Sequence, residues 1–236
     1  MLFIKKKCYP KFEQHYSFSY FCALFNKITM IFYSKYIENA VNEISKLPGI
    51  GRRTALRLVL HLIKERVEDV CAFTESITNL KSKLFFCKKC FNFSDETYCE
   101  ICRQIKRDAS IICVVQDVRD LIAIENTAQY NGLYHVLGGV ISPIDGVGTN
   151  QLTLTELFQR VENKKIDEVI LALPATTEGD TTNFYIYKNV KEKVNKVTTI
   201  ARGVGIGEEL EYTDEITLGR SLHSRIDFEN AYIKRE

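Results

Sequence analysis

Apolar residues follow two different patterns along this chain of 236 residues. In the first half they recur three and four positions apart, which is typical of helices that bury one face. In the second half they form short unbroken runs rich in Val and Ile, which are typical of buried parallel strands. We therefore expect an α+β chain with a helical first part and an α/β second part.

The helical pattern predicts three helices before the first cysteine pair. One begins at Tyr36 and ends at Leu47, because the proline that follows disfavours helical backbone there. The next begins after Gly51, and the third covers residues 70–84. The apolar positions expected on the buried face of the second helix are Leu56, Leu58, Val59, Leu60, Leu62 and Ile63.

Apolar runs and helical stretches alternate after Asp108. The strands are predicted at 111–115, 133–137, 168–173 and 197–201. The helices between them are predicted at 117–130, 153–163 and 181–194. Thr153 is expected to cap the second of these helices, with Glu156 three residues on. Such alternation predicts a mostly parallel, doubly wound sheet with ligands beyond the carboxyl ends of its strands.

Two C-x2-C pairs lie between these parts, at Cys87 and Cys90 and at Cys99 and Cys102. Four thiolates at this spacing can close on one tetrahedral Zn²⁺ ion, and four protein ligands leave no open position for water. The pattern favours one structural zinc that contributes folding energy and no catalysis. Two alternatives remain open, namely disulfide pairing and four thiols that are close by coincidence.

The composition changes this picture little. With 45% hydrophobic and 26% charged residues, the chain is expected to be globular, and no run of about 18 apolar residues predicts a membrane helix. Only four of the eight cysteines show a pattern, which favours a reducing compartment. The net charge of +2 says little about which partners the protein has.

Residues 1–29 differ from the rest, with three lysines followed by an aromatic run. We expect an upstream-start artefact or a disordered lead before a functional start at Met30. A targeting peptide is the alternative, although the run is short and lacks a small-residue cleavage site.

A basic hairpin follows the first predicted helix. Gly49 and Gly51 allow a tight turn that presents backbone N–H groups at the start of the next helix, where an anion is favoured. Arg53 lies in the first turn of that helix, and Arg57 lies one turn later on the same face. The segment resembles the helix-hairpin-helix motif, which grips the DNA backbone. The alternative is an ordinary hairpin with solvated arginines.

An ordered set of motifs resembles the RecR family of bacterial recombination mediators. These motifs are the four cysteines and residues 47–51, 134–137, 141–146, 177–181, 201–203 and 210–218. The resemblance implies a helix-hairpin-helix region at 30–86, a four-cysteine zinc finger at 87–108, a Toprim domain at 109–203 and a C-terminal Walker B-like element and helix at 204–236. Residues 1–29 are then an extension.

The Toprim resemblance distinguishes two classes of function. Toprim enzymes such as topoisomerases use several carboxylates to hold Mg²⁺ for phosphoryl chemistry. The corresponding positions here are Gln116, Pro174 and Thr176, and only Glu178 and Asp180 remain acidic. RecR proteins usually have a glutamate in place of Gln116 and an asparagine in place of Pro174. We interpret Glu178 and Asp180 as a partner contact in a loop, with a solvated loop as the alternative.

The resemblance implies a non-enzymatic, zinc-stabilised, DNA-binding mediator that acts with RecO and RecF to load recombinase onto single-stranded DNA. It also implies a cytoplasmic homo-oligomer, either a dimer or a tetrameric ring. The alternative function is a metal-dependent Toprim nuclease or topoisomerase. Nucleotide binding has little support, because the chain has no G-x-x-x-x-G-K-[ST] motif to accompany the Walker B-like residues 210–214.

Overall fold

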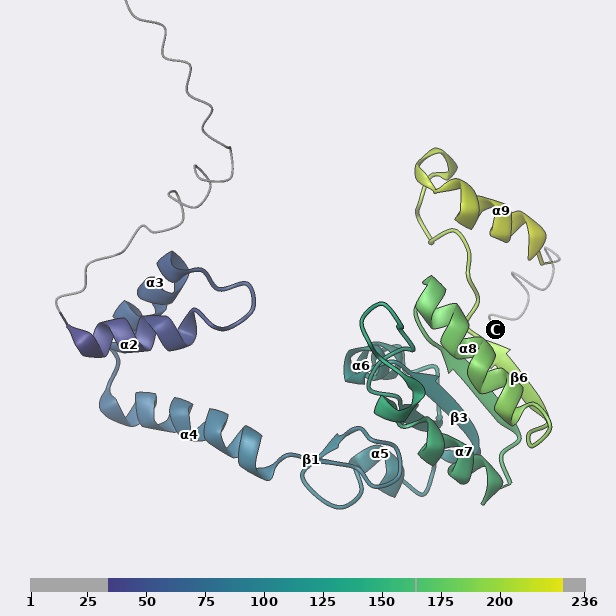
Figure 1. Cartoon of the computed structure of the whole chain (residues 1–236), viewed down its shortest axis with the longest axis horizontal. Helices are drawn as coiled ribbons and strands as arrows, with labels where there is room; N and C mark the ends of the chain where they lie inside the picture. Colours follow the sequence, from purple (N-terminus) through teal and green to yellow (C-terminus); the bar gives the residue numbers. More distant parts are fainter. Residues whose placement is uncertain (1–33, 164, 227–236) are drawn as a thin grey trace, which may run out of the picture. The chain divides into compact units, whose positions relative to one another are not determined.

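The computed structural model describes residues 34–163 and 165–226 (Figure 1). The hypotheses about residues 1–29 therefore lie outside the described residues. The chain divides into two compact units, with the boundary after Ser76.

The first unit is a helical hairpin followed by the first part of a third helix, which continues past the boundary at Ser76. Helix α2 (Lys35–Ile44) packs against α3 (Arg52–Leu62), and α4 (Val67–Lys83) comes next. The centre of the hairpin is formed by Val41, Ala55 and Val59, all buried. The helical first part predicted from the spacing of apolar residues is confirmed.

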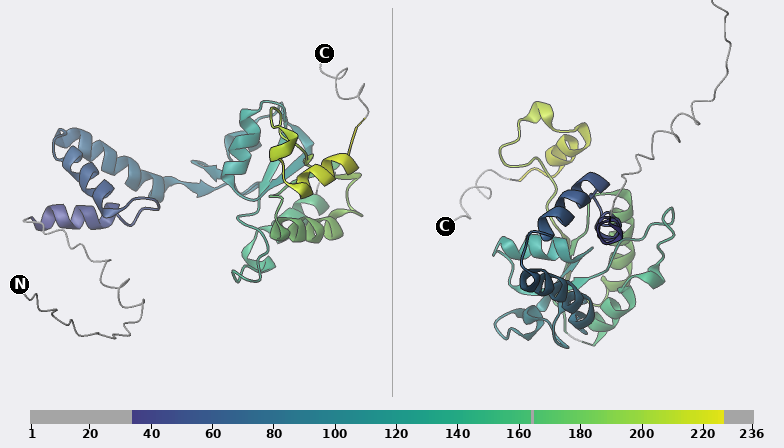
Figure 2. Two further views of the ribbon diagram at one scale, coloured as in Figure 1. Left: turned by 90° about the horizontal axis from the view of Figure 1, so that it is seen from above. Right: turned by 90° about the vertical axis from the view of Figure 1, so that its left-hand side faces the viewer.

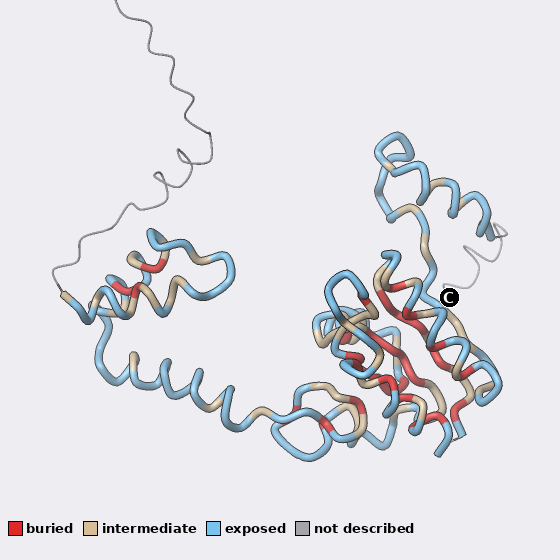
Figure 3. The backbone as a smooth tube through the Cα atoms, viewed as in Figure 1, coloured by how far each residue is buried: buried red, intermediate tan, exposed pale blue. Residues whose placement is uncertain are grey.

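The predicted buried face of α3 is partly wrong. Leu58, Leu60 and Ile63 are 37%, 45% and 59% exposed. Only α2 packs against α3 to a substantial extent in the described part of the unit, so α3 buries Ala55 and Val59, which lie one turn apart, and half-buries Leu56. Figure 3 shows this narrow line of burial between two otherwise exposed helices.

The second unit is built on a parallel sheet of four strands in the order β4-β3-β5-β6. Its strands are β3 (Asp108–Val115), β4 (Gly132–Val136), β5 (Glu168–Ala172) and β6 (Lys196–Thr199). The intervening helices are α6 (Val118–Asn126), α7 (Leu154–Glu162) and α8 (Thr177–Val190), with a short 3-10 turn η1 (Thr149–Gln151) before α7. The predicted parallel α/β arrangement is confirmed.

The sheet separates two apolar clusters. On one face Ile112 and Val169 pack against Leu157 of α7 and Ile186 of α8. On the other face β3 and β4 pack against α6 through Leu121. Figures 1 and 2 show α7 and α8 together on one side of the sheet and α6 on the other. The carboxyl ends of β3 and β5 therefore open toward the same end of the unit.

The C-terminal part consists of a 3-10 turn η2 (Leu210–Tyr212) and helix α9 (Glu215–His223). The Asp214 carboxylate accepts a hydrogen bond of 2.9 Å from the Thr217 N–H and so caps α9. The Walker B-like residues thus form a turn and a helix cap.

The cap predicted for α7 is right in position, since Thr153 is the N-cap residue, but wrong in its hydrogen bond. The Thr153 side chain makes no capping hydrogen bond, and its hydroxyl instead donates to the Val136 carbonyl at 2.7 Å. The ring of His135 lies beside it, with Nε2 2.8 Å from the Thr153 carbonyl. Because a carbonyl only accepts, Nε2 carries a proton, and the low pKa that results from burial keeps the imidazole neutral at pH 7. Burial, with a contribution from Arg160, lowers the pKa of His135 to about 3.

We expect the buried His135 to make the folded protein less stable in acid. The unfolded chain binds a proton near pH 6.5, whereas the folded chain resists it down to about pH 3. Stability is therefore complete above the unfolded pKa and falls by up to about 1.4 kcal/mol per pH unit below it. Urea unfolding at pH 7 and pH 5 should show a smaller pH dependence in His135→Gln than in the parent protein. His223→Gln, at an exposed position, is the control. An unchanged pH dependence in His135→Gln would contradict the assignment.

Candidate metal centre and nucleic-acid interface

The four patterned cysteines come together in a small finger at the start of the second unit. Strands β1 (Phe85–Phe86) and β2 (Phe93–Ser94) form an antiparallel hairpin, and α5 (Glu100–Arg103) follows the second cysteine pair. In the first pair the Phe91 N–H donates to the Cys87 carbonyl at 3.0 Å, with Phe91 in the left-handed region at a φ of 62°. In the second pair the Arg103 N–H donates to the Cys99 carbonyl at 3.1 Å. Both pairs are tight turns that point their sulfurs inward.

The sulfur positions fit a tetrahedral zinc site. The four Sγ atoms lie within 4.8 Å of one another, and Cys90 and Cys99 are 3.4 Å apart. A zinc ion with Zn–S bonds near 2.3 Å requires sulfur separations of about 3.8 Å. Cys87, Cys90 and Cys99 are buried, Cys102 is half-buried, and none of the four is in a disulfide. The predicted zinc ligands are thus brought together as free thiols.

The thiols also perturb one another. Hydrogen bonds from Cys102 and Cys90 lower the pKa of the Cys99 thiol, whereas hydrogen bonds with Cys102 and Cys99 raise the pKa of Cys90. A metal cation would replace the shared protons and hold all four sulfurs as thiolates.

The finger is joined to the sheet at the edge of β4. The Val136 N–H donates to the Cys90 carbonyl at 2.8 Å, so the first cysteine pair covers part of this edge. Phe91 and Ile101 pack against the apolar cluster on the α6 face. The metal centre and the sheet therefore share a core.

The predicted DNA-binding residues lie at the hairpin between α2 and α3. Gly49 has a φ of +78°, a left-handed conformation that favours glycine. Gly51 is the N-cap of α3 and provides no side-chain cap, which leaves N–H groups of the first turn available to a ligand.

Arg53 and Arg57 are both exposed on α3. Neither guanidinium has an ion pair or a side-chain hydrogen bond with another residue in the described ranges. By contrast, Lys46 in the same hairpin is paired with Glu43 at 2.7 Å. The two arginines are therefore available to phosphate groups.

The interpretation of Glu178 and Asp180 as loop residues is wrong. Helix α8 begins at Thr177, earlier than predicted, and the Thr176 hydroxyl accepts a hydrogen bond of 3.1 Å from the Gly179 N–H. Both carboxylates thus lie in the first turn of a helix, where negative charge is favourable. Gly179 is required for close packing, since a Cβ there would lie 2.0 Å from the Pro174 carbonyl oxygen.

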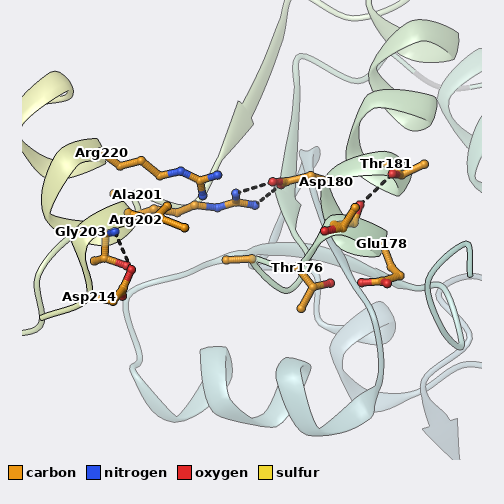
Figure 4. A pocket seen from close by; sticks show the side chains of 13 residues that line it. Thr176, Glu178, Asp180, Thr181, Ala201, Arg202, Gly203, Asp214 and Arg220 are labelled. Carbon is orange, nitrogen blue, oxygen red and sulfur yellow. Dashed lines mark hydrogen bonds and ion pairs between the residues drawn. The ribbon is translucent and has the colours of Figure 1, made fainter.

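These carboxylates line a pocket of about 920 Å³ between the start of α8 and the C-terminal part (Figure 4). Asp180 accepts hydrogen bonds from both terminal nitrogens of Arg202, at 2.6 and 3.1 Å. This guanidinium holds the pKa of the Asp180 carboxyl below its usual range. Arg220 extends from α9 toward the same carboxylate. Glu178 makes no side-chain hydrogen bond or ion pair with the described residues.

The Toprim positions lie where the sheet topology predicted ligands. Gln116 follows β3, and Pro174 and Thr176 follow β5, the neighbouring strand. Their side chains are an amide, a pyrrolidine ring and a hydroxyl, which provide no negative charge for a hard cation. Among the described residues, the four cysteines are the one group of three or more Cys, His, Asp or Glu side chains close enough to share a metal ion.

The fold and the metal centre define a Toprim protein with a four-cysteine zinc finger. Four family models match along the chain: a RecR helix-hairpin-helix at 37–81, a RecR four-cysteine zinc finger domain at 84–103, a Toprim domain at 110–201 and a RecR C-terminal region at 203–226.

Curated relatives named recombination protein RecR are similar over most of the chain. The protein of Flavobacterium johnsoniae is 55% identical over 203 residues, 86% of this chain and 98% of the relative. That of Bacteroides fragilis is 57% identical over 195 residues, 83% of this chain and 95% of the relative. The chain belongs to the RecR family of recombination proteins, and its four cysteines form the family's structural zinc site. No helix in the described ranges has the length and apolarity of a membrane span.

The sequence analysis assigns no role to Arg160 or Arg202. In the structure Arg160 contacts the first cysteine pair through the Lys89 carbonyl, and Arg202 forms an ion pair with Asp180. Arg160 lies three residues after the buried Leu157 and just before the buried Val161. Arg160 could therefore have been found in the sequence as a charged residue on the otherwise apolar face of a helix. Arg202 lies in one of the motifs that carry the RecR resemblance, but its contact with Asp180 could not be predicted, because it joins residues 22 positions apart.

Proposed function

We propose that this protein is a non-enzymatic DNA-binding mediator of recombination that acts with RecO and RecF to load recombinase onto single-stranded DNA. The observation that carries the proposal is the hairpin at Gly49 and Gly51, with its uncapped helix N-terminus and two unpaired arginines, in a chain of the RecR family. Such a surface contacts phosphates and reads no base sequence. In this proposal the protein works in the cytoplasm as a dimer or a tetrameric ring.

The chemistry of the Toprim positions supports a non-enzymatic role. Phosphoryl transfer at this place would require several carboxylates around Mg²⁺, but Gln116, Pro174 and Thr176 provide none. Asp180 is already paired with Arg202. We infer that the pocket beside α8 serves contact with a partner, with Glu178 and Asp180 as its acidic residues.

Charge reversal of the hairpin tests the DNA-binding part of the proposal. Arg53→Glu with Arg57→Glu should weaken binding of all DNA sequences alike, by roughly a hundredfold, because each arginine provides a charge-assisted phosphate contact. The plot of log affinity against log salt should become shallower by about two units. Fluorescence anisotropy with labelled single- and double-stranded DNA at several salt concentrations measures both quantities.

The matched control changes the same net charge elsewhere. Lys188→Glu with Lys191→Glu alters two exposed residues at the end of α8 and should leave affinity within about threefold. Equal effects of the two double variants would show that the weaker binding comes from the change in net charge alone. Unaltered binding and salt slope in the arginine variant would place the DNA surface elsewhere. The same samples with Mg²⁺ should leave the DNA uncut, and cleavage that is lost on changing Glu178 would favour a nuclease.

A further inference from the structure

Arg160 is a buried cation without an acidic partner. It lies on α7 and is only 8% exposed. Its Nη1 atom donates to the Tyr134 carbonyl at 2.6 Å and to the Lys89 carbonyl at 3.3 Å. Its Nε and Nη2 atoms have no hydrogen-bond partner, and no carboxylate among the described residues forms an ion pair with it. None of these contacts provides a negative charge to balance the guanidinium.

A buried guanidinium requires a compensating negative charge. Transfer of an ion from water to a protein interior costs several kcal/mol unless an opposite charge and hydrogen bonds offset the cost. Two carbonyl groups satisfy part of the hydrogen-bonding capacity of Arg160 but carry no net charge. Glu156, one turn earlier on α7, is exposed and unpaired with it. The compensating charge must therefore come from another element.

The zinc finger is that element. Lys89, whose carbonyl Arg160 contacts, lies between the ligands Cys87 and Cys90. Arg160 and Cys102 line the same cavity of about 530 Å³. Burial lowers the pKa of Arg160, and the negative charges of Cys102, Cys90 and Cys87 oppose that lowering. Because it bonds the carbonyl of the residue next to Cys90 and shares a cavity with Cys102, the guanidinium lies beside the cysteine cluster.

We propose that Arg160 is a positioning residue of the zinc site, whose guanidinium balances the charge of the zinc–tetrathiolate cluster. Four thiolates and one Zn²⁺ ion carry a net charge of about −2, which a nearby buried cation offsets. The same residue ties the first cysteine pair to β4 through the Lys89 and Tyr134 carbonyls. Arg160 therefore stabilises the zinc–tetrathiolate cluster, and the cluster in turn stabilises the buried guanidinium, since such a coupling free energy is reciprocal.

Zinc affinity of the full-length, zinc-loaded protein tests the proposal. Competition with a chromophoric chelator should show that Arg160→Met binds zinc roughly 10- to 100-fold more weakly, as expected for loss of a residue that supports a metal site. Lys88→Met is the matched control, because it removes one positive charge from an exposed position between Cys87 and Cys90. Its zinc affinity should stay within about threefold. Equal weakening in both variants would overturn the proposal.

Two further variants separate charge from hydrogen bonding. Arg160→Lys keeps the charge and loses the planar guanidinium, whereas Arg160→Gln keeps a hydrogen-bond donor and loses the charge. The proposal expects zinc affinity close to the parent value in Arg160→Lys and a loss in Arg160→Gln similar to that in Arg160→Met. The reverse order would show that Arg160 serves only to join the two carbonyls and would overturn the proposal. If Arg160→Met gives no folded protein, the Lys and Gln variants carry the test.

Discussion

Replacing Cys99 with serine should reduce bound zinc from about one ion per chain to a small fraction and should lower the melting temperature markedly. A serine hydroxyl does not ionise at neutral pH, so the site loses one of four thiolates. Structural zinc sites contribute binding free energies of about 10–16 kcal/mol, and a site with three thiolates retains only part of this. Elemental analysis of the purified reduced protein and a thermal melt measure the two effects.

The effect should extend beyond the finger. Cys99 is only 4% exposed, and the first cysteine pair is hydrogen-bonded to the edge of β4 through the Cys90 carbonyl. Loss of the metal would expose this edge and the apolar contacts of Phe91, so soluble yield should fall as well. Cys71→Ser, at an exposed cysteine outside the site, should change neither property. Full metal content and an unchanged melting temperature in Cys99→Ser would contradict the structural role of zinc.

The zinc site and the parallel sheet could be predicted because their signals are local. Two C-x2-C pairs bring sulfurs together through short turns, whatever surrounds them. The run from Ile111 to Val115 is apolar on both faces, as a central parallel strand requires, and β3 indeed lies between β4 and β5.

The errors arose where burial or a helix boundary depends on distant contacts. Leu60 is apolar and helical, yet it is 45% exposed because no second helix covers that side of α3 among the described residues. The sequence predicts a loop at Glu178 and Asp180, but Gly179 between them lets α8 approach the Pro174 carbonyl. A glycine in a sequence does not distinguish a turn from a close contact.

The two acidic residues of the proposed partner surface are unequal in the structure. Glu178 has no side-chain partner among the described residues, so its charge is available to another protein. Asp180 is paired with Arg202 and so links α8 to the segment after β6. A double substitution would remove the proposed partner contact and the Asp180–Arg202 ion pair at the same time. The two residues must therefore be changed separately.

Glu178→Lys should abolish association with the proposed RecO-like partner, with a loss of affinity of more than about a hundredfold, because it places a positive charge against a surface complementary to a negative one. DNA binding and the melting temperature should remain at the parent values. Glu192→Lys, at an exposed glutamate just after α8, is the matched control and should retain the partner. A pull-down, a DNA-binding assay and a melting curve on each variant provide the measurements. Retained association in folded Glu178→Lys would show that Glu178 is an ordinary solvated residue that does not contact the partner.

Asp180 requires a charge swap. Asp180→Asn should remove the ion pair with Arg202 at a cost of about 1 kcal/mol or less, because the Asp180 side chain is 45% exposed. Asp180→Arg with Arg202→Asp restores a pair of opposite charges in the reverse order. If Asp180 contacts the partner directly, the swapped protein should still fail to associate even though its melting temperature recovers. Recovery of association together with stability would show that Asp180 acts by holding the C-terminal part in place, and would leave Glu178 as the acidic residue that faces the partner.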